Sequence, residues 1–123
     1  MSKYGAKKVT IDGITFDSKA EGRYYEHLQK LKKTGVVEYF EMQKVFTLLD
    51  RFAHPHTGRI VRAVTYRADF EVYYTDGRVE VVDVKGFMKN QVFLIKQKLF
   101  MYRYQIPLVI VKWDAKTKTF IEV

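Results

Sequence analysis

The stretch VTYRADFEVYYTDGRVEVVDVKG, residues 64–86, decides the fold of this chain. It contains two β-prone runs joined by Asp76-Gly77, a dipeptide typical of tight hairpin turns. We therefore predict two antiparallel strands. Each run carries an acid where an apolar residue is expected, Asp69 in the first and Asp83 in the second. Because residues two apart on a strand share a face, Asp83 and Lys85 project together.

These acids indicate a metal site. Two carboxylates on adjacent strands repel each other, and burying both in ionised form is costly unless a cation joins them. Glu21 in the preceding helical segment is close to that helix's apolar stripe and supplies a third carboxylate. Mg²⁺ binds through one or two carboxylates and keeps several waters, so this set suits it. A nearby lysine would orient or deprotonate the attacking water, or stabilise charge on a phosphate.

The metal hypothesis makes a prediction about strand register. A two-residue turn at Asp76-Gly77 would place Asp69 opposite Val84, which leaves Asp69 and Asp83 on opposite faces. A three-residue loop, or a β-bulge before Asp69, would shift the register by one residue. We therefore expect such a correction, because only then do the two acids share a face.

The first half of the chain predicts a hairpin, a helix and two strands. The hairpin covers residues 8–16 around Asp12-Gly13, and the helix runs between an N-cap at Ser18 and Gly35, with Tyr24, Leu28 and Leu31 on one face. The segments VVEYF (36–40) and KVFTLLD (44–50) favour strands. The segment RFAHPHTGRI (51–60) contains Pro55 and Gly58 and is interpreted as a turn or loop.

After residues 64–86 the sequence predicts a second helix and two more strands. Asn90 is a candidate N-cap, followed by Val92, Ile95, Leu99 and Tyr102 at helical spacing. The run PLVIVKW (107–113) suits a strand covered on both faces, and KTFIEV (118–123) an edge strand. The predicted fold class is mixed α/β (α+β), a central mixed sheet flanked by helices, in the order hairpin, helix, three or four strands, helix, strand, strand.

Composition bounds the class of protein. The 123 residues fit one domain, 1–123, with residues 1–7 as a loose basic N-terminal segment. There are no cysteines, which excludes disulfides and thiolate zinc sites. No run approaches a membrane span and the start lacks a signal-peptide pattern, so a cytoplasmic protein is expected. The net charge of +8 favours a polyanion such as nucleic acid, although a basic protein without such a partner has the same charge.

The ordered set of helix acid Glu21, strand acid Asp69 and the next-strand triplet Asp83-Val84-Lys85, followed by a helix and a strand, resembles the PD-(D/E)XK nuclease superfamily. The segments SKYGAKK, FDSKAEGRYYEHL, YRADFEVYY and VVDVKG are similar to small phage and prophage proteins described as Holliday-junction resolvases or endonucleases. The resemblance covers nearly the whole chain and implies a restriction-endonuclease-like core. Ala68 stands where the superfamily name has proline, and Asp83 where glutamate is more usual.

The resemblance implies roles for four residues. Asp69 and Asp83 would bind Mg²⁺, and Mn²⁺ could replace it. Glu21 would complete the metal site. Lys85 would act on the attacking water. The implied activity is hydrolysis of phosphodiester bonds in branched or recombination-type DNA, in the cytoplasm of a phage-infected or prophage-carrying bacterium. A homodimer is expected by analogy, because resolving a branch needs two cuts.

Simpler interpretations stay open at this point. Ser18-x-x-Glu21 is also a capping box, and Asp83 with Lys85 could form a salt bridge at a strand end. Arg67 and Glu71 share the face of Asp69 and could contact DNA, support the site or form a cross-strand ion pair. The predicted phosphate contacts are Lys96, Lys98, Lys89, Arg103, Lys7 and Lys8; for those on and before the second helix, a solvated helix face is the alternative. The alternative functions are a nucleic-acid-binding protein without catalysis on a nuclease fold, and a sequence-specific restriction-type endonuclease.

Overall fold

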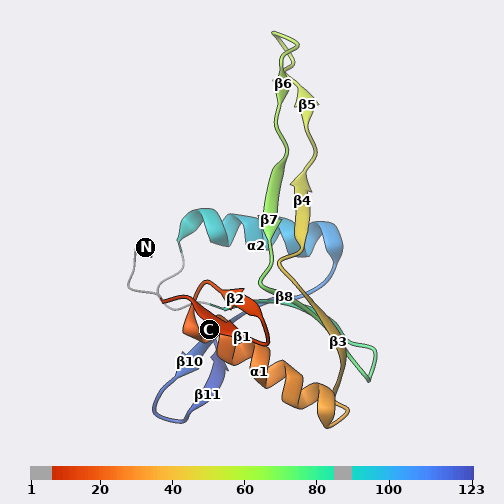
Figure 1. Cartoon of the computed structure of the whole chain (residues 1–123). Coiled ribbons are helices and arrows are strands. Elements are labelled where there is room, and N and C mark those ends of the chain that lie inside the picture. Colours follow the sequence, from red (N-terminus) through yellow and green to blue (C-terminus); the bar gives the residue numbers. More distant parts are fainter. Residues whose placement is uncertain (1–6, 85–89) are drawn as a thin grey trace.

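The computed structural model of the chain describes residues 7–84 and 90–123. The elements in chain order are β1 (Val9–Ile11), β2 (Ile14–Phe16), α1 (Lys19–Lys33), β3 (Val37–Met42), β4 (Val45–Leu49), β5 (Phe52–Ala53), β6 (Ile60–Val61), β7 (Val64–Arg67), β8 (Phe70–Tyr74), β9 (Val79–Val84), α2 (Gln91–Tyr104), β10 (Leu108–Asp114) and β11 (Thr119–Glu122). Figure 1 shows the two helices, the sheet between them and a long ribbon that leaves the body. The prediction of a central mixed sheet with two helices is confirmed.

Local signals account for the ends of the helices and the first hairpin. Ser18 caps α1 by accepting a hydrogen bond from the Glu21 backbone N–H at 3.1 Å, and Asn90 caps α2 in the same way through the Phe93 N–H at 2.7 Å. The β1–β2 hairpin turns at Asp12-Gly13, as predicted. It packs on α1 at Gly22, where an added Cβ would lie 2.8 Å from a Val9 methyl carbon.

The central sheet has the strand order β11-β10-β9-β8-β3, in which β10 runs parallel to β9 and the other pairs are antiparallel. The prediction that β10 is covered on both faces is confirmed: Leu108 and Ile110 pack on the α2 side, and Val111 packs on the α1 side. The strand β11 forms one edge, also as predicted.

Each face of the sheet carries one helix. On one face Tyr24, Tyr25 and Leu28 of α1 pack against Val82 and Val84. On the other face Phe93 and Phe100 of α2 join a second buried cluster, which includes Val81 of β9. Since Val81 and Val82 are successive residues of one strand, the two clusters lie on opposite sides of the sheet.

The residues through which α2 packs are not those whose spacing predicted the helix. The four residues at helical spacing are exposed: Val92, Ile95, Leu99 and Tyr102. Phe93 and Phe100 are buried instead, and Leu94, Met101 and Tyr104 pack beside them. The prediction of a helix is confirmed, but its apolar pattern does not mark the buried face, because this helix is apolar on more than one side.

The segment 51–60 is not a simple loop. It contains β5 and the first residue of β6. These strands pair through Phe52↔Val61 and Ala53↔Ile60 and extend the β4–β7 ribbon away from the body (Figure 1). The turn prediction holds only at the tip, where the His54 N–H donates to the Arg59 carbonyl at 2.7 Å. We call residues 50–63 the arm.

Candidate functional site

The long run 64–74 is divided between two sheets. Strand β7 pairs with β4 in the ribbon, and β8 pairs with β3 and β9 in the central sheet. Between them, Ala68 is buried in the α2-side cluster whereas Phe70, two residues later, is buried in the α1-side cluster. Regular alternation would put both side chains on one face, so the chain bends at Ala68-Asp69, between β7 and β8. Irregular strand positions of this kind re-aim side chains.

The register between β8 and β9 is the one that a shared acid site requires. Phe70 pairs with Val82 and Tyr73 with Val79. The connection is a three-residue loop, because the Tyr74 N–H donates to the Arg78 carbonyl and leaves residues 75–77 between them. Gly77 occupies the left-handed conformation (φ 94°) that such a loop needs at its last position. The predicted register correction is confirmed, and continuing it by one residue places Asp69 opposite Asp83.

Hydrogen bonds hold both acids at this end of the sheet. Asp69 Oδ2 accepts a hydrogen bond from the Val84 N–H at 2.8 Å, where the paired part of β8 has already ended. Asp83 is 5% exposed, and its Oδ2 accepts a hydrogen bond from the Tyr66 hydroxyl at 2.6 Å. The two carboxylates are thus anchored by neighbouring strands, and one of them is almost fully buried.

Both acids affect the pKa of the Tyr66 hydroxyl. Burial raises the pKa of its hydroxyl well above the ordinary value, and the negative charge of Asp83, the hydrogen bond to it and the charge of Asp69 raise that pKa further. No local sequence pattern distinguishes Tyr66 from the other tyrosines. Only the bend at Ala68-Asp69 brings its hydroxyl to the acid pair.

A third acid on the same strand, Glu71, has its own cation. It is 3% exposed and accepts a hydrogen bond from Lys44 Nζ at 2.8 Å. Burial and a hydrogen bond with Glu71 raise the pKa of Tyr73 to about 12. The ion pair expected for Glu71 is therefore present, with Lys44 as the partner, and Glu71 belongs to a neutralised contact beside the acid pair.

Glu21 is half-buried in the first turn of α1. The buried residues of α1 pack on the sheet face that carries Val82 and Val84, whereas the Asp83 carboxylate binds Tyr66 on the other face. Within residues 7–84 and 90–123, no group of three or more His, Asp or Glu side chains lies close enough to hold one ion. The structure thus brings Asp69 and Asp83 together without Glu21 in such a group, and the cap at Ser18 gives the Glu21 backbone a structural role.

The predicted phosphate contacts fall into three groups. Lys89 lies outside the described residues, as does Lys85, the predicted catalytic lysine. Lys7, Lys8 and Lys98 are exposed. Two side chains of α2 instead hold the ribbon: Lys96 Nζ donates to the Thr65 carbonyl at 2.9 Å, and Arg103 forms an ion pair with Asp50 at 3.1 Å.

Comparison with known proteins identifies the family. The family model described as "Protein of unknown function (DUF1064)" matches residues 1–122. The chain belongs to the DUF1064 family. No curated protein matches it. In this DUF1064 protein, none of the described helices is long and apolar enough to cross a membrane.

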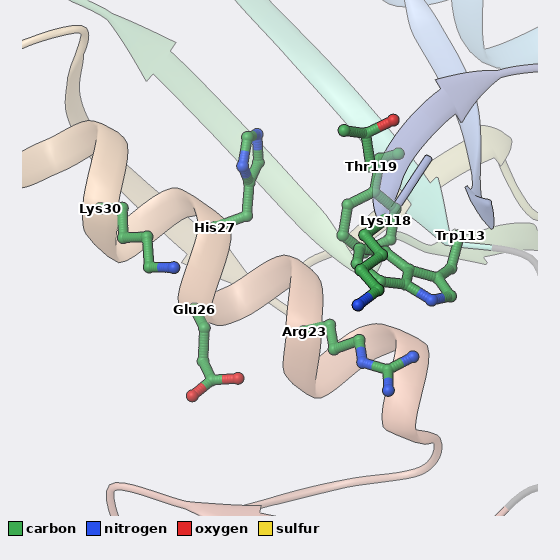
Figure 2. Close-up of a pocket in the computed structure, with 8 residues that line it drawn as sticks. Arg23, Glu26, His27, Lys30, Trp113, Lys118 and Thr119 are labelled. Atoms are coloured by element: carbon green, nitrogen blue, oxygen red, sulfur yellow. The ribbon is translucent and has the colours of Figure 1, made fainter. Parts of the chain in front are cut away.

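The DUF1064 chain has a concave site of about 400 Å³ on the other side of the molecule, between α1 and the β10–β11 hairpin (Figure 2). Arg23 lies over the Trp113 ring at 4.6 Å, and Lys118 also reaches toward that ring, while Glu26 points away (Figure 2). Lys30 lines it too, and burial together with the Lys30 charge lowers the pKa of His27. With Glu26 as the single carboxylate among its lining residues, this cavity does not supply the paired acids.

Sequence reasoning also missed the arginines of the arm. Arg51, Arg59 and Arg62 are exposed, in a segment that had been interpreted as a loop. A signal was present in the sequence, because residues 51–63 contain three arginines and no acid. Without knowledge that the segment forms a ribbon, nothing indicated where those charges point.

Proposed function

We propose that this protein is a metal-dependent DNA endonuclease of the PD-(D/E)XK type, with its active centre at Asp69 and Asp83. The observation that carries the proposal is the three-residue β8–β9 loop, because its register, continued by one residue beyond Phe70↔Val82, places these acids opposite each other. A tight two-residue turn would have satisfied the same hairpin equally well. The register therefore supports a shared site more specifically than the presence of the acids does.

The donor atoms suit Mg²⁺. Carboxylate oxygens are the ligands that Mg²⁺ prefers, and it commonly binds through two of them. The hydrogen bonds from Tyr66 and Val84 each engage one oxygen, Oδ2, and an ionised carboxylate has about four acceptor sites. A bound Mg²⁺ would lower the pKa of a coordinated water and stabilise charge on the phosphate.

The protein's own contribution is positioning. Asp83 is fixed by the rigid β9 strand, by burial and by the Tyr66 hydroxyl. Asp69 is fixed by the Val84 amide of the neighbouring strand. Lys85 follows two residues after Asp83, and we assign it the role of orienting the attacking water on the resemblance alone. Side chains that are already held in position favour the reaction, because they need no reorganisation when charge develops.

Cleavage of DNA tests the proposal. Purified protein with Mg²⁺ or Mn²⁺ would be offered linear duplex, flap and four-way-junction DNA. Asp83→Asn, Asp69→Asn and Lys85→Ala should each lower the cleavage rate by at least roughly 100-fold, the scale of losing one group that stabilises a transition state. Glu38→Gln, which changes an exposed carboxylate on β3, is the matched control and should cleave as the wild type does.

The DNA that is cut decides the substrate. Preference for the junction or flap supports a structure-selective enzyme acting as a homodimer, whose mass light scattering would measure. Discrete cuts in linear duplex, without preference for branches, would instead support a restriction-type enzyme.

A second candidate function is DNA binding without cleavage. One observation favours it: both acids already have hydrogen-bond donors from the protein, and the described residues bring no third acid to them. If wild type and Asp83→Asn bind DNA equally and neither cleaves any substrate with either metal, this binding function replaces the nuclease.

A further inference from the structure

The arm is held away from the body by its base. Three side chains of α2 contact the ribbon near that base: Lys96 and Arg103, described above, and Tyr104, whose hydroxyl donates to the Thr47 carbonyl at 2.8 Å. Every residue from Arg51 to Ile60 is exposed, and Figure 1 shows β5 and β6 extending beyond both helices. The arm is therefore a projecting ribbon with an anchored root.

Hydrogen bonds also order the tip of the arm. His54 Nδ1 accepts hydrogen bonds from the backbone N–H groups of His56 at 3.1 Å and Thr57 at 3.2 Å, and the Gly58 N–H donates to the His54 carbonyl at 2.9 Å. Gly58 has φ 74°, a conformation that glycine adopts without strain. These contacts present the tip in a defined shape, which lowers the entropy cost of binding a partner.

The charges on the arm are one-sided. Continuing the Phe52↔Val61 register by one residue places Arg51 opposite Arg62, and like charges directly opposite are unfavourable in a ribbon. Among the described residues, no carboxylate lies within ion-pair distance of Arg51, Arg59 or Arg62. The single acid of the arm, Asp50, is already paired with Arg103. An external anion would relieve this arrangement.

The arm leads directly to the acid pair. Arg67, also exposed, ends the strand that contains Tyr66 and lies two residues before Asp69. From Arg67 to Arg59 the chain spans at most roughly 26 Å, at about 3.3 Å per residue. Duplex DNA carries one phosphate per 3.4 Å along each strand, and its major groove is wide enough for a two-stranded ribbon. The line of arginines therefore matches a run of several phosphates that ends at the acids.

We propose that the arm is a duplex-DNA-binding ribbon, which lies in a groove and places Arg51, Arg59 and Arg62 on phosphates so that the backbone reaches Asp69 and Asp83. This inference rests on the proposed function and names the element that holds its substrate. A second copy of the chain is a poorer partner for the arm, because each copy carries a net charge of +8. Binding by the ribbon is independent of the metal.

The test measures DNA affinity against salt in EDTA, so that no cleavage is needed. A fluorescent 20-bp duplex would be titrated with wild type, with Arg51→Ala/Arg62→Ala, and with Lys32→Ala/Lys33→Ala as a control that removes two exposed charges at the far end of α1. Each phosphate contact contributes about 0.9 to the slope of log affinity against log salt. For Arg51→Ala/Arg62→Ala, the arm variant, the slope should be less steep by about 1.8, and the affinity at 0.1 M salt should be roughly 60-fold weaker. The control should keep the wild-type slope.

The possible results separate the two proposals. If wild type binds the duplex and the arm variant has the wild-type slope, the arm inference is overturned while the nuclease proposal stands. If both double variants lower the slope equally, the arm has no special role and the inference is also overturned. If light scattering shows that the arm variant changes only the oligomeric state, the arm is an interface between copies. Absence of any DNA binding by the wild type overturns the proposed function itself.

Discussion

The base and the far end of the ribbon that contains β4 and β7 both carry large apolar residues, but their surroundings are opposite. At the base, Phe46, Leu48 and Tyr66 are buried against α2. At the far end, Phe52 and Ile60 are exposed, and arginines without a described acidic partner lie beside them. One continuous ribbon therefore has a part that belongs to the protein core and a part that faces outward.

The position of a residue along the ribbon, and not its hydrophobicity, decides whether it is buried. Phe46 and Phe52 are six residues apart, yet Phe46 is 6% exposed and Phe52 is 43% exposed. The same holds for polar groups: the Tyr66 hydroxyl is buried on Asp83, whereas the arm's arginines remain in solvent. Burial at the base fixes the acid site, and exposure at the tip leaves charge available to a ligand.

The largest expected effect comes from truncating the two phenylalanines. Phe46→Ala should lower the free energy of unfolding by about 3–5 kcal/mol, because it leaves a cavity beside Phe100 and Tyr104. Phe52→Ala should change it by less than about 0.5 kcal/mol, as expected of an exposed position. Urea denaturation followed by circular dichroism measures both. Equal losses from the two variants would mean that the tip is covered in solution, contrary to the structure.

A smaller effect is expected from the hydroxyl of Tyr66. Tyr66→Phe removes the hydroxyl that donates to the buried Asp83 carboxylate, which should cost about 1–3 kcal/mol of unfolding free energy. Tyr102→Phe is the matched control, since Tyr102 is 82% exposed, and it should cost less than about 0.5 kcal/mol. A Tyr66→Phe protein as stable as the control would show that the phenol does not hold Asp83 in solution.

The smallest effect under ordinary conditions is a loss of stability that begins only near pH 10. Burial, with nearby carboxylates, raises the pKa values of Tyr24, Tyr66 and Tyr74 in the folded protein, and that of Tyr73 to about 12. The unfolded chain loses these protons near pH 10, so the stability they contribute is complete below pH 10 and is lost as the pH rises toward the folded values.

Absorbance of tyrosinate followed together with circular dichroism tests this sign. The tyrosines with raised pKa values, Tyr24, Tyr66, Tyr73 and Tyr74, should form tyrosinate only as the protein unfolds. Titration of all nine tyrosines in one step near pH 10, without loss of structure, would contradict the prediction.

Much of the candidate site could be predicted from the sequence. The parts that could not be predicted were missed for physical reasons. Asp69 and Asp83 stand out because charges inside β-prone runs are costly without a partner. The three-residue loop followed from requiring both acids on one face. Tyr66 could not be found, because its contact spans 17 residues and depends on a bend that no local pattern indicates. For the same reason Lys96 and Arg103 looked like phosphate contacts, although they hold the ribbon.

Features that depend on a few neighbouring residues could be predicted from the amino-acid sequence: the turn at Asp12-Gly13, the caps at Ser18 and Asn90, and the strand covered on both faces at 108–114. Short hydrogen bonds and local backbone preferences control these. Only the tertiary structure decided which face of α2 is buried, where the strand divides at Ala68-Asp69 and how far the arm projects. Those features depend on which distant surfaces fill the two cores, and packing of that kind leaves no periodic signal within one segment.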